Sequence, residues 1–175
     1  MAEKRPFVLL DDARECGAAD ALLFENPREI FNAQRPEQVA EALAAAEAAR
    51  QAGGELAGFI AYEAGLALED RLRPLADARS GGGGPLVWLG LFDAPTRIAA
   101  ADMPDWLAAH AQGGGSVGPL EPQLSPGGYA QAFGTLQDAI RAGDIYQANL
   151  TFPLAGNFTG DPLGLYAALR PAAQA

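Results

Sequence analysis

The feature of the sequence that most limits its fold is an alternating run of apolar and polar residues over positions 144–158. In an extended strand, successive side chains point to opposite faces. One face of this run would carry Tyr146, Ala148, Leu150, Phe152 and Leu154. The other face would carry Ile145, Gln147, Asn149 and Thr151. The pattern predicts a strand with an apolar face in a core and a mostly polar opposite face, as in an antiparallel sheet.

The polar face presents the amides of Gln147 and Asn149 and the hydroxyl of Thr151. If this face points inward, such a row lines a polar cavity in a sheet enzyme. If it points outward, the same row is a half-solvated strand surface. Spacing alone leaves both interpretations open, so these three residues are candidates for a substrate cleft.

Helices are predicted where end signals flank a helical period. The first covers residues 36–51, with a proline in its first turn and Gly53 as its stop. The second begins with Ser125 as N-cap and ends at Gly143, and the third begins at Asp161. Shorter helical stretches are expected up to about residue 72 and over 104–110.

Short apolar runs separated by turn residues predict further strands. They lie at residues 7–10, 21–24, 29–31, 56–62 and 86–92. Strands early in the chain, followed by a helix-strand-helix order at its end, favour an α+β fold with large antiparallel sheets and flanking helices.

Charge excludes some classes of partner. The chain has 12 basic and 22 acidic residues and a net charge of -10, the wrong sign for nucleic acid or an anionic membrane surface. An anionic small molecule stays possible, because a local cluster of arginines can outweigh the global charge. Arg35, Arg71 and Arg73 are candidates for such a cluster, or else solvated surface charges.

The chain offers little for thiol or phosphate chemistry. One cysteine, Cys16, excludes an internal disulfide, and with the single His110 it is expected to be structural. The glycine runs at 80–84 and 113–115 lack the Lys and Ser/Thr of a phosphate loop, and the first is expected to be a flexible loop. The absence of a long apolar run and of a signal peptide predicts a soluble, cytoplasmic protein.

Several segments resemble chorismate-utilising enzymes, most closely aminodeoxychorismate synthase component I. Residues 141–151 read R-A-G-D-I-Y-Q-A-N-L-T, which resembles a segment that recurs in that family. Residues 57–65 and 161–170 resemble two further family segments, and residues 22–27 lie where the family has its L-L-E-S strand. The resemblance spans almost the whole chain, and its most specific part is G-D-I-Y-Q.

The resemblance implies part of a two-sheet α+β sandwich whose cleft binds chorismate and Mg²⁺. Residues 1–118 would form the N-terminal α+β region, and residues 119–175 the truncated start of the chorismate-binding region. In the resembling synthase, ammonia from a glutamine amidotransferase partner replaces the C4 hydroxyl of chorismate, a step of p-aminobenzoate and folate biosynthesis. A transferase of this kind is therefore expected.

The catalytic lysine and the metal-binding glutamates of the family have no counterpart in the sequence. Lys4 is the single lysine and lies at the start of the chain. No catalytic residue and no metal ligand is therefore predicted here, and the 175 residues alone are expected to be inactive.

Other readings of the resemblance stay open. Glu25 and Asn26 match the strand that helps form an amino-acid pocket in anthranilate synthases, although Asn26 and the following proline could simply reverse the chain. Anthranilate, isochorismate and salicylate synthases are competing enzymes. A non-catalytic aromatic amino-acid-binding module and an amidotransferase-docking module are alternatives of another class. The resemblance also suggests a fused aminodeoxychorismate lyase domain.

Overall fold

The computed structural model describes residues 6–79 and 84–173, and the chain divides into two compact units after Met103. Unit 1 comprises residues 1–103 and unit 2 residues 104–174. The predicted boundary between residues 118 and 119 separates regions of the resembled family rather than compact units, and it stays a prediction. The loop expected over residues 80–84 lies mostly outside the described residues.

Unit 1 contains two antiparallel sheets of three strands each. The first has the order β1-β2-β6, with β1 at Phe7–Leu10, β2 at Ala21–Glu25 and β6 at Thr96–Ile98. The second has the order β3-β5-β4, with β3 at Glu29–Ala33, β5 at Val87–Phe92 and β4 at Glu55–Ile60. All five strands predicted in this part of the chain are confirmed.

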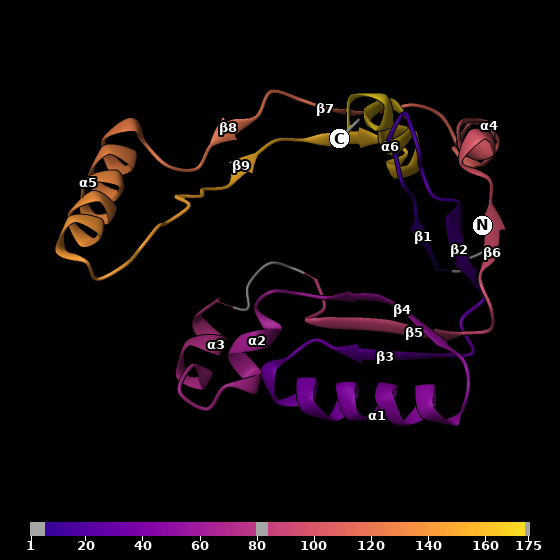
Figure 1. Cartoon of the computed structure of the whole chain (residues 1–175), viewed down its shortest axis with the longest axis horizontal. Coiled ribbons are helices and arrows are strands. Elements are labelled where there is room, and N and C mark those ends of the chain that lie inside the picture. The colour runs from indigo at the N-terminus through magenta and orange to yellow at the C-terminus, as the bar shows by residue number, and fades with distance from the viewer. Residues whose placement is uncertain (1–5, 80–83, 174–175) are drawn as a thin grey trace. The chain divides into compact units, whose positions relative to one another are not determined.

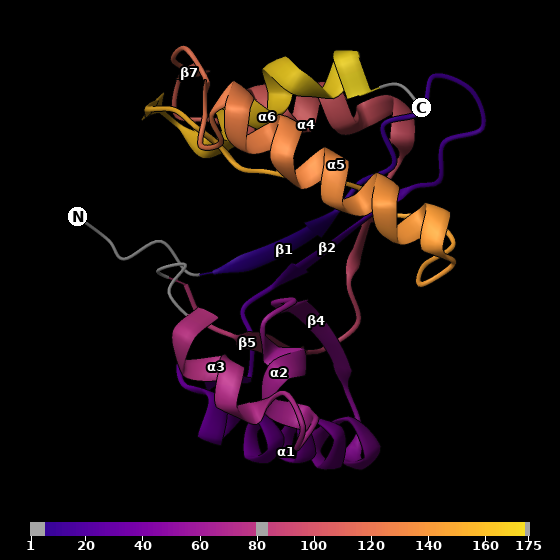
Figure 2. The same ribbon diagram turned by 90° about the vertical axis from the view of Figure 1, so that its left-hand side faces the viewer.

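Unit 1 also has helices between its strands, the longest of which packs on the second sheet. They are η1 (Pro36–Gln38), α1 (Val39–Ala52), α2 (Ala64–Leu68) and α3 (Arg73–Arg79). The long helix α1 lies along β3 and β5, and α2 lies next to both α1 and α3 (Figures 1 and 2). The predicted first helix is confirmed, and Gly53 ends it with a φ of 115°, which favours glycine.

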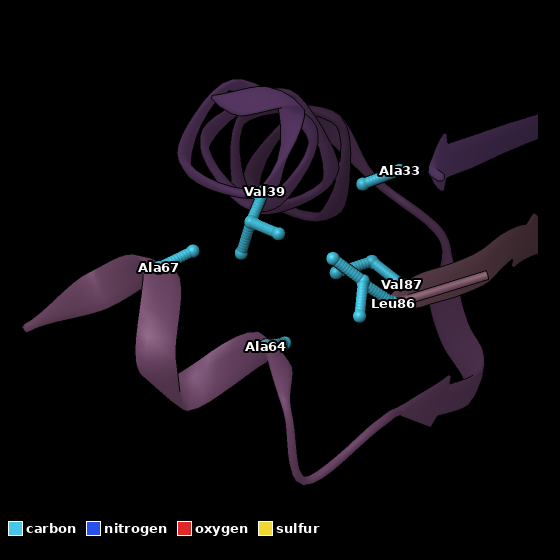
Figure 3. Close-up of a cluster of buried hydrophobic side chains, with 6 residues drawn as sticks. All are labelled: Ala33, Val39, Ala64, Ala67, Leu86 and Val87. Carbon is cyan, nitrogen blue, oxygen red and sulfur yellow. The ribbon is translucent and has the colours of Figure 1, made fainter. Parts of the chain in front are cut away.

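The main core of unit 1 lies between these helices and the sheet. Its buried side chains come from the end of β3, from α1 and α2, and from the start of β5 (Figure 3). They are Ala33, Val39, Ala64, Ala67, Leu86 and Val87. Two smaller clusters of buried side chains include residues of the same sheet. One lies around Phe24 and Phe92, and the other lies around Phe31 and Leu91. Burial of each large apolar side chain contributes about 1.5–3 kcal/mol.

Unit 2 is built from helices and two short antiparallel ribbons. After η2 (Ala100–Asp102), its elements are α4 (Met103–His110), β7 (Gly115–Val117), β8 (Glu121–Pro122), α5 (Pro126–Ala142), β9 (Leu154–Ala155), β10 (Phe158–Gly160), α6 (Pro162–Leu169) and η3 (Arg170–Ala173). The ribbons pair β7 with β10 and β8 with β9. Figure 1 shows α5 beyond the β8–β9 ribbon, and no residue of α5 is buried.

The predicted caps of α5 and α6 are confirmed. The Ser125 hydroxyl accepts a hydrogen bond from the Gly128 backbone N–H, and Gly143 ends α5 in the left-handed conformation with a φ of 81°. The Asp161 carboxylate accepts the N–H of Gly164 and also that of Gln112. One carboxylate therefore caps α6 and ties it to the segment that follows α4.

The strand predicted over residues 144–158 is wrong for residues 144–153. That stretch has irregular backbone, and only the short strands β9 and β10 form within the predicted range. A strand needs a neighbour that satisfies its backbone groups. Among the described residues, the two-residue strand β8 pairs with β9, and no strand pairs with residues 144–153. The α+β class with antiparallel sheets and flanking helices is nevertheless confirmed, with sheets of two or three strands.

Glycines of unit 2 allow its backbone segments to approach closely. A Cβ atom on Gly164 would lie within 3.0 Å of the Gly113 carbonyl oxygen. A Cβ atom on Gly160 would likewise lie within 3.0 Å of the Gly114 carbonyl oxygen. Gly115, Gly160 and Gly164 therefore let β7 approach β10 and the start of α6 closely. No helix among the described residues has the length and apolar composition needed to cross a membrane.

We predict opposite effects for two glycine-to-alanine changes in unit 2. Gly164→Ala is expected to destabilise unit 2 by about 1–3 kcal/mol, because the added methyl group overpacks a backbone contact. Gly134→Ala, in α5, meets nothing within 4 Å and is expected to stabilise by about 0.5–1 kcal/mol through helix propensity. Urea unfolding followed by Trp106 fluorescence measures both. If both variants changed the free energy of unfolding equally, the close backbone contact at Gly164 would be contradicted.

Candidate functional site

The segment of residues 144–153 is fixed at both ends. At its start, the backbone N–H of Asp144 donates to the carbonyl oxygen of Ala139 at 3.0 Å, and that of Gly143 donates to Ile140 at 3.1 Å. These bonds form the usual glycine stop of a helix. At the other end, the N–H of Gln123 donates to the carbonyl oxygen of Pro153 at 2.9 Å. The chain therefore leaves α5 and returns beside the residues that precede it.

The three predicted cleft residues lie together on this segment. Gln147, Asn149 and Thr151 are all exposed, and within the described part of the chain their side chains make no hydrogen bond. Two amides and one hydroxyl are thus available to a ligand. They do not belong to a sheet, so the strand interpretation does not determine which way they point.

Apolar side chains surround this polar row without being covered by the rest of unit 2. Tyr146 is 93% exposed, and Ile145, Phe152 and Leu154 are each more than one third exposed. Leu150 alone in residues 144–153 is half-buried. Partly exposed apolar side chains thus flank the polar row in sequence.

The basic group nearest in sequence to this segment is already paired. Arg141 Nη1 lies 3.1 Å from Asp138 Oδ1, and Nη2 lies 3.4 Å from Gln137 Oε1. Both charged side chains are largely exposed, so the pair adds little stability. The polar row therefore offers neutral donors and acceptors to a ligand.

Glu25 and Asn26 lie in unit 1, at the end of β2. Asn26 adopts a left-handed conformation with a φ of 55°, which asparagine tolerates better than most residues. The next residues lead into β3, where the N–H of Arg28 donates to the carbonyl oxygen of Leu91 at 2.7 Å. The conformation at Asn26 fits the chain-reversal interpretation, and Glu25 is exposed beside it.

Sequence reasoning missed an apolar groove in unit 1. The groove has a volume of about 470 Å³ and lies between the start of β1 and strands β4 and β5. It is lined by Pro6, Phe7, Val8, Leu9, Gly58, Phe59, Pro85 and Trp88. Glu25 stands opposite Phe7 in the β1–β2 register but does not line the groove. The aromatic residues at 7, 59 and 88 were visible in the sequence, but only the pairing of distant strands brings them together.

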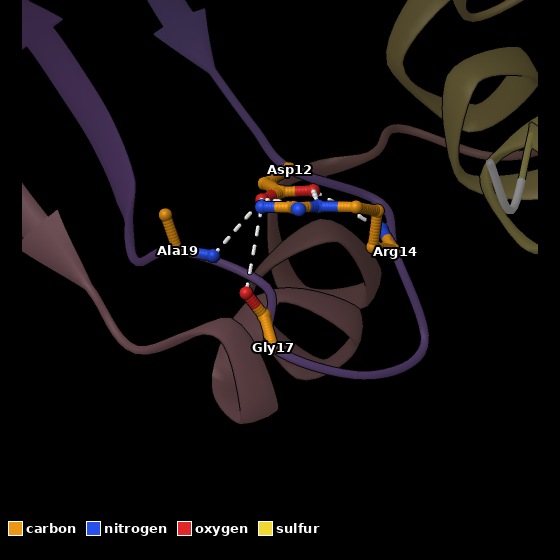
Figure 4. Close-up of polar contacts among 4 residues, drawn as sticks. All are labelled: Asp12, Arg14, Gly17 and Ala19. Atoms are coloured by element: carbon orange, nitrogen blue, oxygen red, sulfur yellow. Dashed lines mark hydrogen bonds and ion pairs between the residues drawn. The ribbon is translucent and has the colours of Figure 1, made fainter.

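Hydrogen bonds to the carboxylate of Asp12 hold the loop that connects β1 to β2 (Figure 4). Arg14 Nε lies 2.9 and 3.0 Å from the two carboxylate oxygens of Asp12, and the N–H of Ala19 donates to the same group at 3.0 Å. The hydrogen bonds from the Arg14 side chain, and then those from backbone N–H groups, hold the pKa of Asp12 well below its usual range. Cys16 lies exposed in this loop.

We predict a pH dependence for this loop. Because the folded pKa of Asp12 is depressed, its contribution to the free energy of unfolding is complete above the unfolded value of 3.8 and is lost as the pH falls below that value. Arg14→Gln is expected to raise the pKa of Asp12 toward its ordinary value. NMR titration of the carboxyl carbons measures this directly.

The pair of Glu47 and Arg50 provides the matched control for this titration. Hydrogen bonds from Arg50, and then from Gln51, lower the pKa of Glu47 to about 2. Arg50→Gln should raise the Glu47 value and leave Asp12 unchanged. A titration of Asp12 near 3.8 in the unaltered protein would contradict the loop geometry.

The remaining predicted candidates have ordinary structural roles. Arg35 pairs with Glu37 at 2.5 Å, and Arg73 lies 3.9 Å from Asp70, all four side chains being exposed. His110 donates from Nδ1 to the carbonyl oxygen of its neighbour one turn earlier at 2.7 Å. These contacts fit solvated charges and a helix-end histidine.

The described residues do not fit a complete metal site. Within residues 6–79 and 84–173, no three His, Cys, Asp or Glu side chains gather into a group that could hold a metal ion. A Mg²⁺ ion needs carboxylate or other oxygen ligands in near-octahedral geometry. No reaction step through Mg²⁺ follows from these residues.

Comparison with known families decides the class of the chain. The sequence model of the family described as chorismate binding enzyme matches residues 5–175. The chain belongs to this family. No curated protein and no solved structure matches it.

Family membership gives the chain a chemical context. The chain is a chorismate-binding domain, its substrate is chorismate, and the enzyme to which it belongs uses chorismate. The match covers both compact units, so each unit is part of the family domain.

Proposed function

We propose that this chorismate-binding domain belongs to an aminodeoxychorismate synthase component I, a transferase of p-aminobenzoate and folate biosynthesis. The supporting observation is the family match over residues 5–175, together with the G-D-I-Y-Q-A-N-L-T segment at 143–151. That segment has the strongest resemblance to this group of chorismate-utilising enzymes. Its exposed polar row is where we expect the domain to meet its substrate.

In this proposal, residues 147, 149 and 151 bind and orient chorismate. The ligand carries carboxylates, a hydroxyl and an ether oxygen, so the amide N–H groups of Gln147 and Asn149 donate to it and the hydroxyl of Thr151 donates or accepts. Each such bond is worth about 0.5–1.5 kcal/mol.

The reaction itself requires groups that this chain does not supply. Ammonia, delivered by a glutamine amidotransferase partner in the cytoplasm, replaces the C4 hydroxyl of chorismate, and water is released. The nucleophilic lysine and the carboxylates for Mg²⁺ would come from other parts of the full polypeptide.

Product analysis tests this proposal. The full polypeptide, incubated with its amidotransferase, glutamine, Mg²⁺ and chorismate, is expected to form 4-amino-4-deoxychorismate, identified by liquid chromatography and mass spectrometry. Anthranilate, isochorismate or salicylate as the product would overturn the proposal in favour of a related enzyme. Formation of p-aminobenzoate without an added lyase would indicate the fused lyase domain.

Variants of the polar row test its part in binding. Gln147→Leu is expected to raise the KM for chorismate about tenfold, because one donor to the ligand is lost. Gln131→Leu is the matched control, since Gln131 is an exposed glutamine on α5 outside the row. If both changes raise the KM for chorismate equally, the polar row does not bind chorismate.

A second function, binding of an aromatic amino acid, is favoured by the groove in unit 1. Its lining is largely apolar and includes Phe7, Phe59 and Trp88, which suit an aromatic ring. Glu25 and Asn26, which the resemblance assigns to an amino-acid pocket, lie at the end of the neighbouring strand β2 but do not line the groove. Calorimetric titration of the chain with tryptophan tests this, and Trp88→Ala should abolish any heat of binding that arises in the groove.

A further inference from the structure

An aromatic contact joins the polar segment to the start of α5. The rings of Tyr129 and Phe152 lie edge to face, with centroids 5.9 Å apart and an interplanar angle of 79°. Tyr129 also stacks on Phe133 one turn later, at 6.2 Å. Both distances fall in the range of favourable aromatic pairs.

This contact lies close to the polar row in sequence. Phe152 directly follows Thr151 and is three residues from Asn149. In the described chain, residues 144–153 belong to no sheet, so no ladder of backbone hydrogen bonds holds the positions of their side chains. Fixing an irregular backbone costs about 1–2 kcal/mol per residue in conformational entropy, so contacts elsewhere must offset that cost.

We infer that Tyr129 and Phe152 form an aromatic latch that positions Gln147, Asn149 and Thr151 for chorismate. This inference rests on the proposed function for the choice of ligand, but the latch itself is a property of the fold. Tyr129 and Phe152 are positioning residues that act through the segment. Neither needs to touch the substrate.

The end contacts explain why one aromatic pair is enough to direct the segment. The glycine stop at Gly143 fixes the start, and the hydrogen bond from Gln123 to Pro153 fixes the end. A chain held at both ends needs few further contacts to select one path, because closure has already removed most of its freedom. The latch adds a side-chain anchor within one residue of the polar row.

Because both rings are partly exposed, the loss of their contact is expected to affect the segment only locally. Phe152 is 38% exposed and Tyr129 is 42% exposed, so the contact is not part of a deep core. Loss of such a pair should open the segment locally without unfolding unit 2. An aromatic pair contributes enough to change local opening by roughly tenfold.

NMR relaxation of the backbone amides tests the latch on the chain without any ligand. In Phe152→Ala, the order parameters of residues 145–152 are expected to fall below about 0.6, the range of a flexible backbone, whereas those of α1 and β5 stay near about 0.85. Phe152→Tyr should keep the higher order parameters because it keeps the ring. Phe59→Ala is the control, since this phenylalanine in unit 1 is 49% exposed and its loss should not affect the segment.

Two further variants separate the loss of the aromatic ring from the loss of apolar volume. Phe152→Leu keeps most of the apolar volume but removes the ring, and Tyr129→Leu does the same on the helix. Both should have lower order parameters in residues 145–152 than the unaltered chain. Unchanged order parameters in these two variants and in Phe152→Ala would overturn the latch.

Chorismate binding distinguishes failure of the latch from failure of the proposed function. Calorimetric titration should show about tenfold weaker binding of chorismate by Phe152→Ala and restored binding by Phe152→Tyr. If the order parameters fall in Phe152→Ala but the full polypeptide does not bind chorismate, the proposed function fails and the latch stands. If binding occurs and neither binding nor the order parameters change in Phe152→Ala, the latch fails and the function stands.

Discussion

Phe92→Ala is expected to destabilise unit 1 by about 3–5 kcal/mol, the largest change that we predict for a single side chain. Phe92 is 1% exposed and packs against Phe24, with ring centroids 5.5 Å apart. It is one of the three buried residues of its cluster, so its removal leaves a cavity that the neighbours cannot fill. Urea unfolding, followed through hydrogen exchange of the β5 amides, measures the loss.

The control for this change is Phe59→Ala. Phe59 lies in the paired strand β4 but is 49% exposed, so truncation should cost less than half as much. Similar losses for both variants would show that Phe92 does not have the buried environment described here.

Gly58→Ala is expected to destabilise unit 1 by about 2–5 kcal/mol. Gly58 has a φ of 150°, a conformation that residues with a side chain rarely adopt. An added Cβ would also lie within 3.0 Å of the Trp88 carbonyl oxygen in the paired strand β5. Backbone strain and overpacking therefore act together. The same unfolding experiment measures the effect.

Gly65→Ala provides the matched control in the same unit. Gly65 lies in α2, where an added Cβ meets nothing within 4 Å, and its φ is ordinary. Alanine is expected to stabilise the helix by about 0.5–1 kcal/mol. Destabilisation by Gly65→Ala as large as that by Gly58→Ala would contradict the local geometry of β4.

The elements that the sequence predicted well are those with local causes. The helices α1, α5 and α6 begin and end at residues whose backbone preferences or side-chain hydrogen bonds act over a few positions, such as Gly53, Ser125 and Asp161. The strands of unit 1 are compact apolar runs between turns, and their pairing partners lie within the same unit.

The segment of residues 144–153 shows where local reasoning fails. Its alternation is a correct description of the sequence, but alternation does not supply a partner strand. Within the described residues no strand pairs with it, so the backbone follows an irregular path and the apolar side chains stay exposed. The predicted cleft residues lie close together in sequence on this irregular segment, and their part in binding stays a prediction.

The apolar groove of unit 1 escaped prediction for a related reason. Phe7, Gly58 and Trp88 are separated by tens of residues, and strand pairing and topology bring them to one place. The closing contact between Asp12 and Arg14 is short in sequence but needs a specific loop conformation, including the N–H of Ala19. Neither arrangement follows from the periodic spacing of apolar residues in the sequence.

The most direct test of our account is an NMR titration of the chain with chorismate, observing the side-chain amide signals of Gln147 and Asn149. We predict that both pairs of signals shift with one saturating curve, and that the exposed amide of Gln131 does not shift with them. Shifts confined to other parts of the chain, with both signals unchanged at saturation, would contradict the assignment of chorismate to this segment.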